Sequence, residues 1–580
     1  MRRPWWVLLG GSRRRDERGF AAVLVALLFP VVFLACAALS VDTARWYVEA
    51  ENVQSAVDAA ALAGVVWMPG DFDNAKSAAL AVAKNNGFDA ASPDLTVRVE
   101  HGEKASQLKV TISSRISNAF GSAIGTPTTV VSRSAVADYA GGLSMGSPCN
   151  DFGSDPDSAA AGGVSTNCSD AGDFWANVGG PKSDKGSGDA YQNGACPSKY
   201  DGCTAAGGTN TDYDANGYIY EVTVAKPVSN FRLEAFDPAL IHVGDHCEDS
   251  ALTGASSLSV TDSVVADPTT RYVSGDGKYC TGDNSFDASS KALGFNNQVN
   301  TSFTVRSMAP DSDPSRPLTW PILNTSTCPG AKTYRGYNGR TQSFKDSNGN
   351  VTTDMSANVP LKSVLNPNDP GYQKDVADTF RRWVTLCSNS SVQAGTTLAI
   401  QVKTNGLGFD LAAGHNRFAL RAYSATSPSS NNDIAISAFN KMAVYANVKN
   451  GSSRFFLTRL PSSAAGQMLN VSLFDIGDLG GATGTLKFVA PAESNITFTN
   501  CRAVGKVNGT VSDCQFTADS TFNGRWQSVY IPIPSNYTCS DALATGCWVK
   551  LYYDFPLAGS PNDTTSWAAS VDGQPVRLVQ

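Results

Sequence analysis

Ser144 is the first residue of the sequence whose surroundings could do chemistry. It stands in Gly-Leu-Ser-Met-Gly, the pattern of a nucleophile elbow, which holds a serine at a sharp turn between a strand and a helix. Here Ser-Pro-Cys-Asn and a loop-like composition follow instead of a helix, and the chain has only four histidines that could act as the base. We therefore predict no catalytic residues, no cofactor and no enzymatic activity.

Asp212, Asp214 and Asn216 alternate in front of Gly217, a spacing with which an EF-type loop presents oxygen ligands to calcium. The twelfth place of such a loop is Thr223 rather than a bidentate glutamate, and the segment leads into an alternating strand pattern. An Asn-Gly pair before Tyr-Ile-Tyr also fits an ordinary hairpin turn. We favour the turn and predict no metal site, with these three residues as the calcium alternative.

His242 and His246 lie four residues apart, next to Cys247, a spacing that could hold zinc on a helix. The proline and glycine around them favour a loop in which the cysteine forms a disulfide.

Twelve of the thirteen cysteines lie beyond residue 148, whereas Cys36 stands alone in an apolar block. An even number of cysteines in segments rich in Gly, Ser and Asp is typical of disulfides made in an oxidising compartment. The sequence does not fix their connectivity. Short-range pairing would give Cys149–Cys168, Cys196–Cys203, Cys247–Cys280, Cys328–Cys387, Cys501–Cys514 and Cys539–Cys547.

The composition of the 580 residues, with 17% charged side chains, 52 glycines and 28 prolines, predicts several loop-rich, strand-rich domains. The net charge of the first 19 residues is +4. Because the net charge of the whole chain is −7, the remaining residues carry −11. That remainder contains no basic stripe, so a nucleic-acid partner is not expected.

Residues 20–40 contain no charge, and 21 helical residues suffice to cross about 30 Å of hydrocarbon. Arginines precede this block and Asp42 follows it, which predicts a single-pass protein of the cell membrane with a cytoplasmic N-terminus. The bulk of the chain would then lie on the oxidising side, in agreement with the cysteines. Two cleavage alternatives remain open, a lipobox-like run ending at Cys36 and a signal-peptidase pattern at Ala35-x-Ala37.

A helical pattern continues beyond the apolar block to Pro69-Gly70, which a removed signal peptide would not need. Small and apolar residues recur at spacings of 4, 3, 4, 3 and 4, so that they share one face. We expect this stem packing face to let a partner helix or a sheet approach closely, and stems to pack side by side through it. Its members are Trp46, Ala50, Val53, Val57, Ala60 and Gly64.

Three motifs in this region, Arg18-Gly19-Phe20, Val41-Asp42-x-x-Arg45 and the run from Gln54 to Gly64, resemble the N-terminal stem of TadE/TadG-like proteins. The resemblance covers about residues 13–138. It implies a role in assembling tight-adherence (Flp) pili, with other pilus-assembly or pseudopilin-like stem proteins as partners. It also implies a processing site between Gly19 and Phe20, although Leu24 stands where such substrates usually carry glutamate.

The expected fold is α+β, with a transmembrane helix that continues into a pilin-like stem, followed by two disulfide-rich, sandwich-like β domains. In the stem we expect a second helix over 71–88 and strands near 95–100, 108–114 and 128–137. Further strands are expected from 218 onwards, with a long insertion between about 245 and 365. The expected segments are a basic tail (1–19), a membrane span (20–40), a stem (41–138), a Gly/Ser/Asp-rich linker (139–216) and β domains (217–435 and 436–580).

Two functions follow from this interpretation. The first is a non-enzymatic, membrane-anchored extracytoplasmic component of a tight-adherence pilus or surface-attachment system. The alternative is a cell-surface protein whose β domains bind a glycan or matrix ligand, and whose helix is only a tether in the lipid bilayer.

Overall fold

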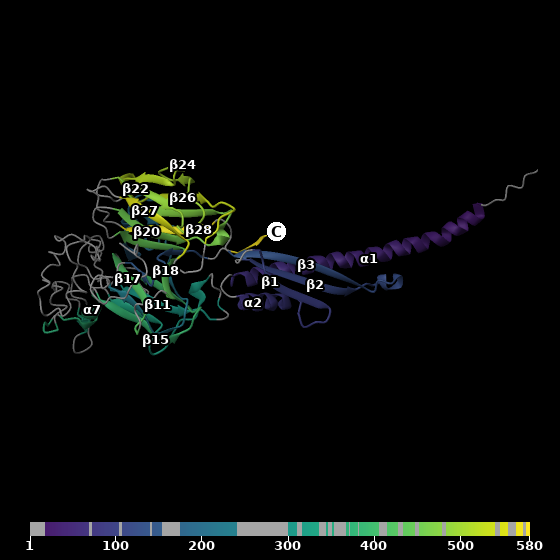
Figure 1. Cartoon of the computed structure of the whole chain (residues 1–580), viewed down its shortest axis with the longest axis horizontal. Coiled ribbons are helices and arrows are strands. Elements are labelled where there is room, and N and C mark those ends of the chain that lie inside the picture. Colours follow the sequence, from purple (N-terminus) through teal and green to yellow (C-terminus); the bar gives the residue numbers. More distant parts are fainter. Residues whose placement is uncertain are drawn as a thin grey trace, which may run out of the picture. The chain divides into compact units, whose positions relative to one another are not determined.

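The computed structural model has more strands than helices among the described residues (Figure 1). It describes residues 18–68, 72–103, 107–139, 142–153, 174–239, 300–309, 312, 316–335, 344–345, 351–352, 367–370, 372–380, 382–404, 414–426, 433–446, 452–477, 483–539, 546–554, 564–571 and 576–579. The chain forms two compact units, one of residues 1–139 with 576–580 and one of residues 140–575. The first unit is called the stem below, and the second the β unit.

Two helices and one antiparallel sheet build the stem (Figure 1). The 48 residues of α1 (Arg18–Val65) would extend roughly 72 Å at the helical rise, and Pro30 lies within them. The second helix, α2 (Phe72–Asn85), has Asp73 in its first turn. It ends where Gly87 adopts a φ of 92° and Phe88 N–H donates to Ala83 O, the arrangement of a Schellman cap.

The stem sheet has the order β1-β2-β3-β29, and all its neighbours are antiparallel. The helix α1 packs on β2 and β3 and against α2, which in turn contacts β1. The last strand comes from the C-terminal end of the chain, so the sheet closes with residues more than 400 positions from its other strands. The strands are β1 (Leu95–His101), β2 (Gln107–Ser117), β3 (Thr128–Tyr139) and β29 (Val576–Val579), and the 3-10 helix η1 (Gly121–Ile124) lies between β2 and β3.

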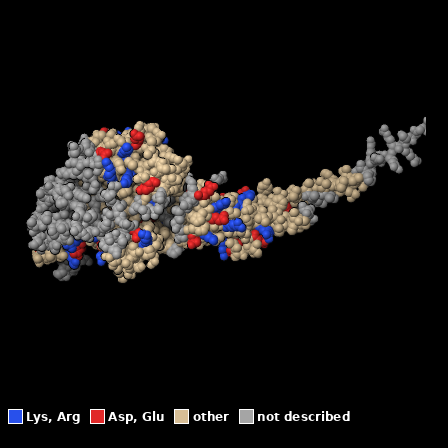
Figure 2. Space-filling view, viewed as in Figure 1, with Lys and Arg blue, Asp and Glu red and all other residues tan. Residues whose placement is uncertain are grey.

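The N-terminal part of α1 carries exposed apolar side chains, among them Val25, Leu27, Phe29 and Phe33. In the view of Figure 2, charged atoms are spread over the sheet-bearing part of the stem, whereas the described atoms of this apolar stretch are uncharged. Among the described residues, no helix combines the length and the apolar character that crossing a membrane requires. The span expected over residues 20–40 therefore stays a prediction.

An 11-stranded sheet forms one half of the β unit, with β5 (Asp151–Phe152) beside β17. Its other strands follow the order β15 (Trp383–Val392), β10 (Val228–Phe236), β17 (His415–Ser424), β6 (Phe174–Gly179), β19 (Lys441–Ala446), β28 (Thr564–Val571), β21 (Met468–Phe474), β26 (Trp526–Pro532), β23 (Asn500–Val504) and β24 (Gly509–Ser512).

A 10-stranded sheet forms the other half. Its order is β12 (Ala331–Arg335), β11 (Asn300–Ser307), β16 (Thr397–Thr404), β9 (Tyr218–Val224), β18 (Ile434–Phe439), β4 (Ser144–Gly146), β20 (Ser452–Arg459), β27 (Trp548–Asp554), β22 (Gly484–Val489) and β25 (Gln515–Ala518). The smaller elements are β7 (Ala195–Cys196), β8 (Gly208–Thr209), β13 (Phe344–Lys345), β14 (Val351–Thr352), α7 (Lys374–Thr379), η2 (Lys185–Ser187), η3 (Pro317–Thr319), η5 (Ser462–Ala464) and η6 (Ser520–Phe522).

One continuous hydrophobic core lies between the two large sheets. Aromatic rings from facing strands meet there, for example Phe174 with Phe455 at 5.9 Å and Phe303 with Phe418 at 5.4 Å between centroids. Alternate side chains of β9 enter this core, because Tyr218, Tyr220, Val222 and Val224 are buried while the residues between them point to the opposite face.

The β-rich character expected from composition and alternation is confirmed, and strands follow from 218 onwards. The range 245–365, expected to be a long insertion, contains β11 and β12 of the 10-stranded sheet. Both large sheets continue across the boundary expected near residue 436. The range 139–216, expected to be a linker, contains β6 in the interior of the 11-stranded sheet. Its residues are buried on both faces, so they lack the alternation by which the other strands were found.

Four of the expected disulfides are present: Cys196–Cys203, Cys328–Cys387, Cys501–Cys514 and Cys539–Cys547. Cys149 is also disulfide-bonded, whereas Cys168, Cys247 and Cys280 lie outside the described residues. Cys36 is a free, exposed thiol on α1.

Candidate functional site on the stem helix

The stem packing face is the side of α1 that turns toward the rest of the stem. Ala50, Val53, Val57 and Ala60 are at most 8% exposed and belong to the core that α1 forms with α2 and the sheet. Trp46, at the start of this face, is half-buried, and its indole N–H donates to Asn118 Oδ1 at 2.9 Å.

Gly64 marks the closest approach of α1 to its neighbours. A Cβ added there would lie 2.5 Å from Cδ2 of Leu108, 2.6 Å from the carbonyl oxygen of Ala75 and 3.0 Å from Cβ of Ala79. Only a residue without a side chain leaves room for α2 and β2 at this position. The small residues of α1 are therefore used within the chain, and side-by-side packing of stems would have to use another face of the helix.

The remaining surface of α1 near its midpoint offers such a face. Val41, Tyr47 and Val48 are 46%, 70% and 61% exposed. A shallow groove of about 430 Å³ runs along this part of the helix and is lined by Val41, Ala44, Arg45, Val48, Glu49 and Ile116.

Asp42, part of the Val41-Asp42-x-x-Arg45 motif, fastens α1 to the loop between β2 and β3. Its carboxylate is 2% exposed and accepts three backbone hydrogen bonds, from Ala119 N–H at 2.7 Å, Phe120 N–H at 3.0 Å and Gly121 N–H at 2.8 Å. Three consecutive N–H groups aimed at one carboxylate bind it as an anion. Asp42 therefore fixes the register between the helix and the far end of the β2–β3 hairpin.

The three donors also set the protonation of this carboxyl. Burial acts to raise the pKa of Asp42, but the N–H groups, together with the charge of Arg45, outweigh it and hold the pKa below its ordinary value of 3.8. Because the pKa is lowered on folding, the stabilisation is present above about pH 4 and is lost as the pH falls through the folded value.

Replacing Asp42 by asparagine is expected to loosen the loop without unfolding the stem. The amide keeps one acceptor but loses the charge that binds three donors, so the amide hydrogens of residues 119–121 should exchange faster, on the order of tenfold. Hydrogen exchange read by mass spectrometry measures this. Asp58→Asn is the matched control, because the hydrogen bond that Asp58 accepts within the described residues comes from Gln54 on its own helix, at 2.8 Å. Equal protection of 119–121 in Asp42→Asn and the parent would contradict the assigned role.

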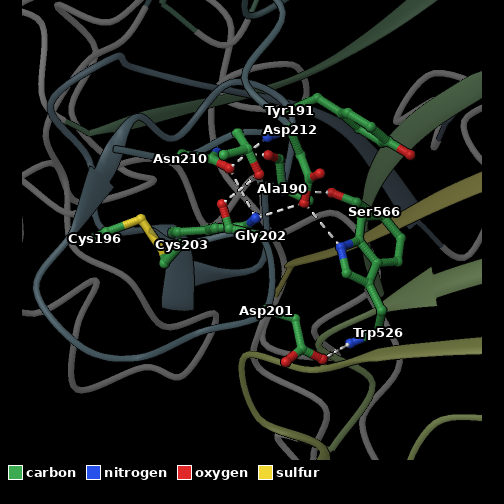
Figure 3. Close-up of polar contacts among 12 residues, drawn as sticks. Ala190, Tyr191, Cys196, Asp201, Gly202, Cys203, Asn210, Asp212, Trp526 and Ser566 are labelled. Carbon is green, nitrogen blue, oxygen red and sulfur yellow. Dashed lines mark hydrogen bonds and ion pairs between the residues drawn. A yellow bond between two sulfur atoms is a disulfide. The ribbon is translucent and has the colours of Figure 1, made fainter. Parts of the chain in front are cut away.

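The candidate calcium residues are held by lysines. Asp212 Oδ2 accepts from Lys185 Nζ at 2.7 Å and from the indole N–H of Trp526 at 2.9 Å; Figure 3 shows Asp212 and Trp526. Asp214 pairs with Lys441 at 2.5 Å. Each carboxylate that would face a calcium ion thus already contacts an ammonium group. Asn216 donates its backbone N–H to Asp214 Oδ1 in the turn that leads into β9, and no metal-binding group of three or more side chains occurs within the described residues.

We expect excess EDTA to leave the thermal unfolding of the purified protein unchanged, because Lys185 and Lys441 already contact the two carboxylates that would have to bind calcium. A lower melting temperature in EDTA, restored by added calcium, would contradict this expectation.

The other two sequence motifs form no site in the described residues. Ser144 begins β4 and its carbonyl accepts from Thr458 Oγ1 at 3.0 Å, so it lies within a sheet rather than at a strand-to-helix turn. His242 and His246 lie outside the described residues.

Comparison with protein families finds a match on this helix. Residues 19–67 match the family described as putative Flp pilus-assembly TadE/G-like. The matched segment spans nearly all of α1, including Asp42 and the stem packing face. It indicates a role related to Flp pilus assembly, as a membrane-associated pilus component with pilus-assembly partners. No curated protein and no solved structure matches the chain.

The sequence indicated Asp42 through its motif but not what it binds. Its partners are main-chain N–H groups about 77 residues further along the chain, and no side-chain pattern distinguishes such groups. Asn118 was likewise missed, although an asparagine between a strand and a glycine-containing loop is a recognisable turn signal. Gly19 and Phe20, the possible processing site, lie in the first turn of α1.

Proposed function

We propose that this protein is a non-enzymatic, membrane-anchored, extracytoplasmic component of a tight-adherence (Flp-type) pilus assembly system. The observation that supports this most is the division of α1 into two parts with different surroundings, within the segment that matches the pilus-assembly family.

The C-terminal part of α1 is a stem helix. From Ala50 to Val65 it packs on its own sheet and on α2, and Asp42 binds the hairpin loop. The N-terminal part carries apolar side chains more than half exposed, such as Leu27 at 67% and Phe29 at 67%. Apolar surface of this extent on a charge-free segment calls for a partner, and we propose lipid for residues 20–40.

The proposed topology places the arginine-rich tail in the cytoplasm and both folded units outside. The disulfides of the β unit support this orientation, since such bonds persist in oxidising surroundings. In this proposal the stem joins other pilus-assembly components through its exposed face, and the β unit is the part presented outward.

Deletion of the protein in its native host tests the proposal. We expect loss of surface pili in electron micrographs and loss of attachment, both restored by the full chain. The Asp58→Asn variant should also restore both and serves as a control for expression. Normal pili with lost attachment would contradict the pilus role and favour a surface-binding protein with a tether.

The mass and the first residue of the protein extracted from host membranes show whether the N-terminal segment is retained, cleaved or lipid-modified. A chain that begins near Met1 fits a retained anchor. A chain that begins at Phe20 would mean processing despite Leu24, and a lipid on Cys36 would contradict a membrane-spanning stem.

A further inference from the structure

A fully buried lysine lies against the side chain of Asn210 in the β unit, in a segment that also contains the Cys196–Cys203 disulfide. Figure 3 shows Asn210 and this disulfide. Lys185, in η2, is 0% exposed. Its Nζ lies 2.8 Å from Asn210 Oδ1 and 2.7 Å from Asp212 Oδ2, and 5.2 Å from the centroid of the Phe474 ring. A lysine side chain is almost never buried to this degree without a specific chemical reason.

The amide of Asn210 has one orientation only. Its Nδ2 donates both hydrogens to backbone carbonyls, to Ala190 O at 2.8 Å and to Asn193 O at 2.7 Å. Its Oδ1 accepts from the backbone N–H of Asp212 at 3.0 Å as well as from Lys185. The carbonyl carbon is thus polarised by a fixed N–H donor, in the way that backbone donors stabilise a developing oxyanion.

Asp212 is placed to take a proton from Lys185. The Oδ2 atom that contacts Lys185 Nζ is oriented by the indole N–H of Trp526. Gly202 covers the pair so closely that an added Cβ would lie 2.4 Å from Lys185 Nζ and 2.1 Å from Asp212 Oδ2. This contact restricts water around the amine.

The surroundings also ease the loss of a proton from the ammonium group of Lys185, which gives the nucleophilic amine. Burial lowers the pKa of Lys185 from its ordinary 10.5, while the hydrogen bond and charge of Asp212 oppose this shift. Desolvated lysines activated in this way act as nucleophiles in other proteins.

We propose that Lys185 and Asn210 become joined by an intramolecular amide bond, formed by the protein itself with Asp212 as the proton carrier. Nζ attacks Cγ of Asn210, and the carbonyl electrons move to Oδ1 beside the Asp212 N–H. Asp212 takes the proton from Nζ and delivers it to Nδ2. The C–Nδ2 bond then breaks, the carbonyl re-forms and one ammonia leaves, so that no oxidant or cofactor is required.

Such a bond would add a second covalent link to a segment that contains the Cys196–Cys203 disulfide. The same segment is tied to the C-terminal strands, because Asp201 accepts from Arg525 and from the Trp526 N–H, and Ser566 Oγ donates to Gly188 O. An amide cross-link is not reversed by reduction. The segment would therefore keep its fold, and its attachment to β26 and β28, in surroundings that open the disulfide.

Mass spectrometry of the full-length protein tests the proposal directly. After complete reduction and alkylation, the wild-type chain is expected to be lighter than its sequence by one ammonia, about 17 Da. Trypsin should fail to cut after Lys185, so that peptide 183–199 remains linked to peptide 200–232, which contains Asn210 and is not cut at the Lys226–Pro227 bond. Fragmentation should place the junction at these two residues.

Several results would overturn the proposal. A reduced chain of full sequence mass, with normal cleavage after Lys185, would show an ordinary buried ion pair. A loss of about 18 Da with the junction at Asp212 would show that the carboxylate, not the amide, is the acceptor. A loss of ammonia without linked peptides would indicate cyclisation at an Asn-Gly site such as Asn193-Gly194.

Two variants separate the chemistry from the packing. Lys185→Arg keeps a cation but removes the primary amine, and Asp212→Asn keeps the shape of the proton carrier but not its basicity. Both should retain wild-type circular dichroism and full sequence mass. The control Lys441→Arg, which alters the neighbouring pair with Asp214, should keep the loss of ammonia. A linked product in Lys185→Arg or in Asp212→Asn would contradict the mechanism.

Discussion

Placing arginine at both Leu28 and Val32 is expected to release the protein from the membrane fraction of its host. These side chains lie near the middle of residues 20–40 and are 54% and 58% exposed on α1. An arginine at the centre of a spanning helix costs about 2.5–3.5 kcal/mol on insertion scales, so the pair would cost about 5–7 kcal/mol. We expect most of the double variant in the soluble or degraded fraction, measured by immunoblot after membrane sedimentation and carbonate washing.

The control also places two arginines on α1, but outside the proposed membrane span. Tyr47 and Val48 are exposed apolar residues of α1 beyond the uncharged stretch, at 70% and 61%. Arginine at these two positions should leave the protein in the membrane fraction. Retention of the Leu28/Val32 variant, or release of the Tyr47/Val48 variant, would contradict a membrane span over 20–40.

The stem shows how far local sequence determines structure. Helical spacing predicted both that α1 continues beyond the apolar block and which of its faces is packed, since both follow from contacts within one element. The prediction placed the end of the helix at Pro69-Gly70, whereas α1 ends at Val65 and a turn precedes the break. The ends of helices depend on a few backbone hydrogen bonds, so the sequence determines them only weakly.

Long-range pairing could not be predicted from local patterns. The strand β29, at the C-terminus, pairs with β3 of the stem, and β6 lies between β17 and β19. Their neighbours in space are far away in sequence, so alternation identifies a strand but not its place in the sheet. The expected division at residue 436 rested on local strand patterns, which do not determine the order of strands in a sheet.

The Lys185 cluster was hidden for a related reason. The sequence drew attention to Asp212, Asp214 and Asn216 through their spacing, but Lys185 and Trp526 approach from 27 and 314 positions away. Alternating acidic residues indicate that a cation lies nearby, but not which one. In the structure, lysine side chains contact the carboxylates whose spacing suggested calcium.

Replacing Gly64 by alanine is expected to destabilise the stem, although alanine stabilises an unconstrained helix by about 1 kcal/mol relative to glycine. The new methyl group would lie 2.6 Å from the carbonyl oxygen of Ala75, a backbone atom of α2 that can withdraw only if the helix moves. Overpacking of this kind costs about 1–3 kcal/mol, which outweighs the gain in helix propensity. Amide exchange of the buried turns of α1 and α2 measures the resulting free energy of opening.

Whether Gly64→Ala speeds or slows amide exchange distinguishes two roles of this glycine, which are close packing within one chain and packing against a neighbouring stem. Ser55→Ala, at an exposed position of α1, raises helix propensity without a contact and should slow exchange slightly or leave it unchanged. If Gly64→Ala also slowed exchange, α1 and α2 would not be in close contact, and the stem packing face would be free for a neighbouring stem. Faster exchange in Gly64→Ala alone means that the glycine serves the fold of a single chain. Pilus-assembly partners must then bind the exposed face of α1 around Val41, Tyr47 and Val48.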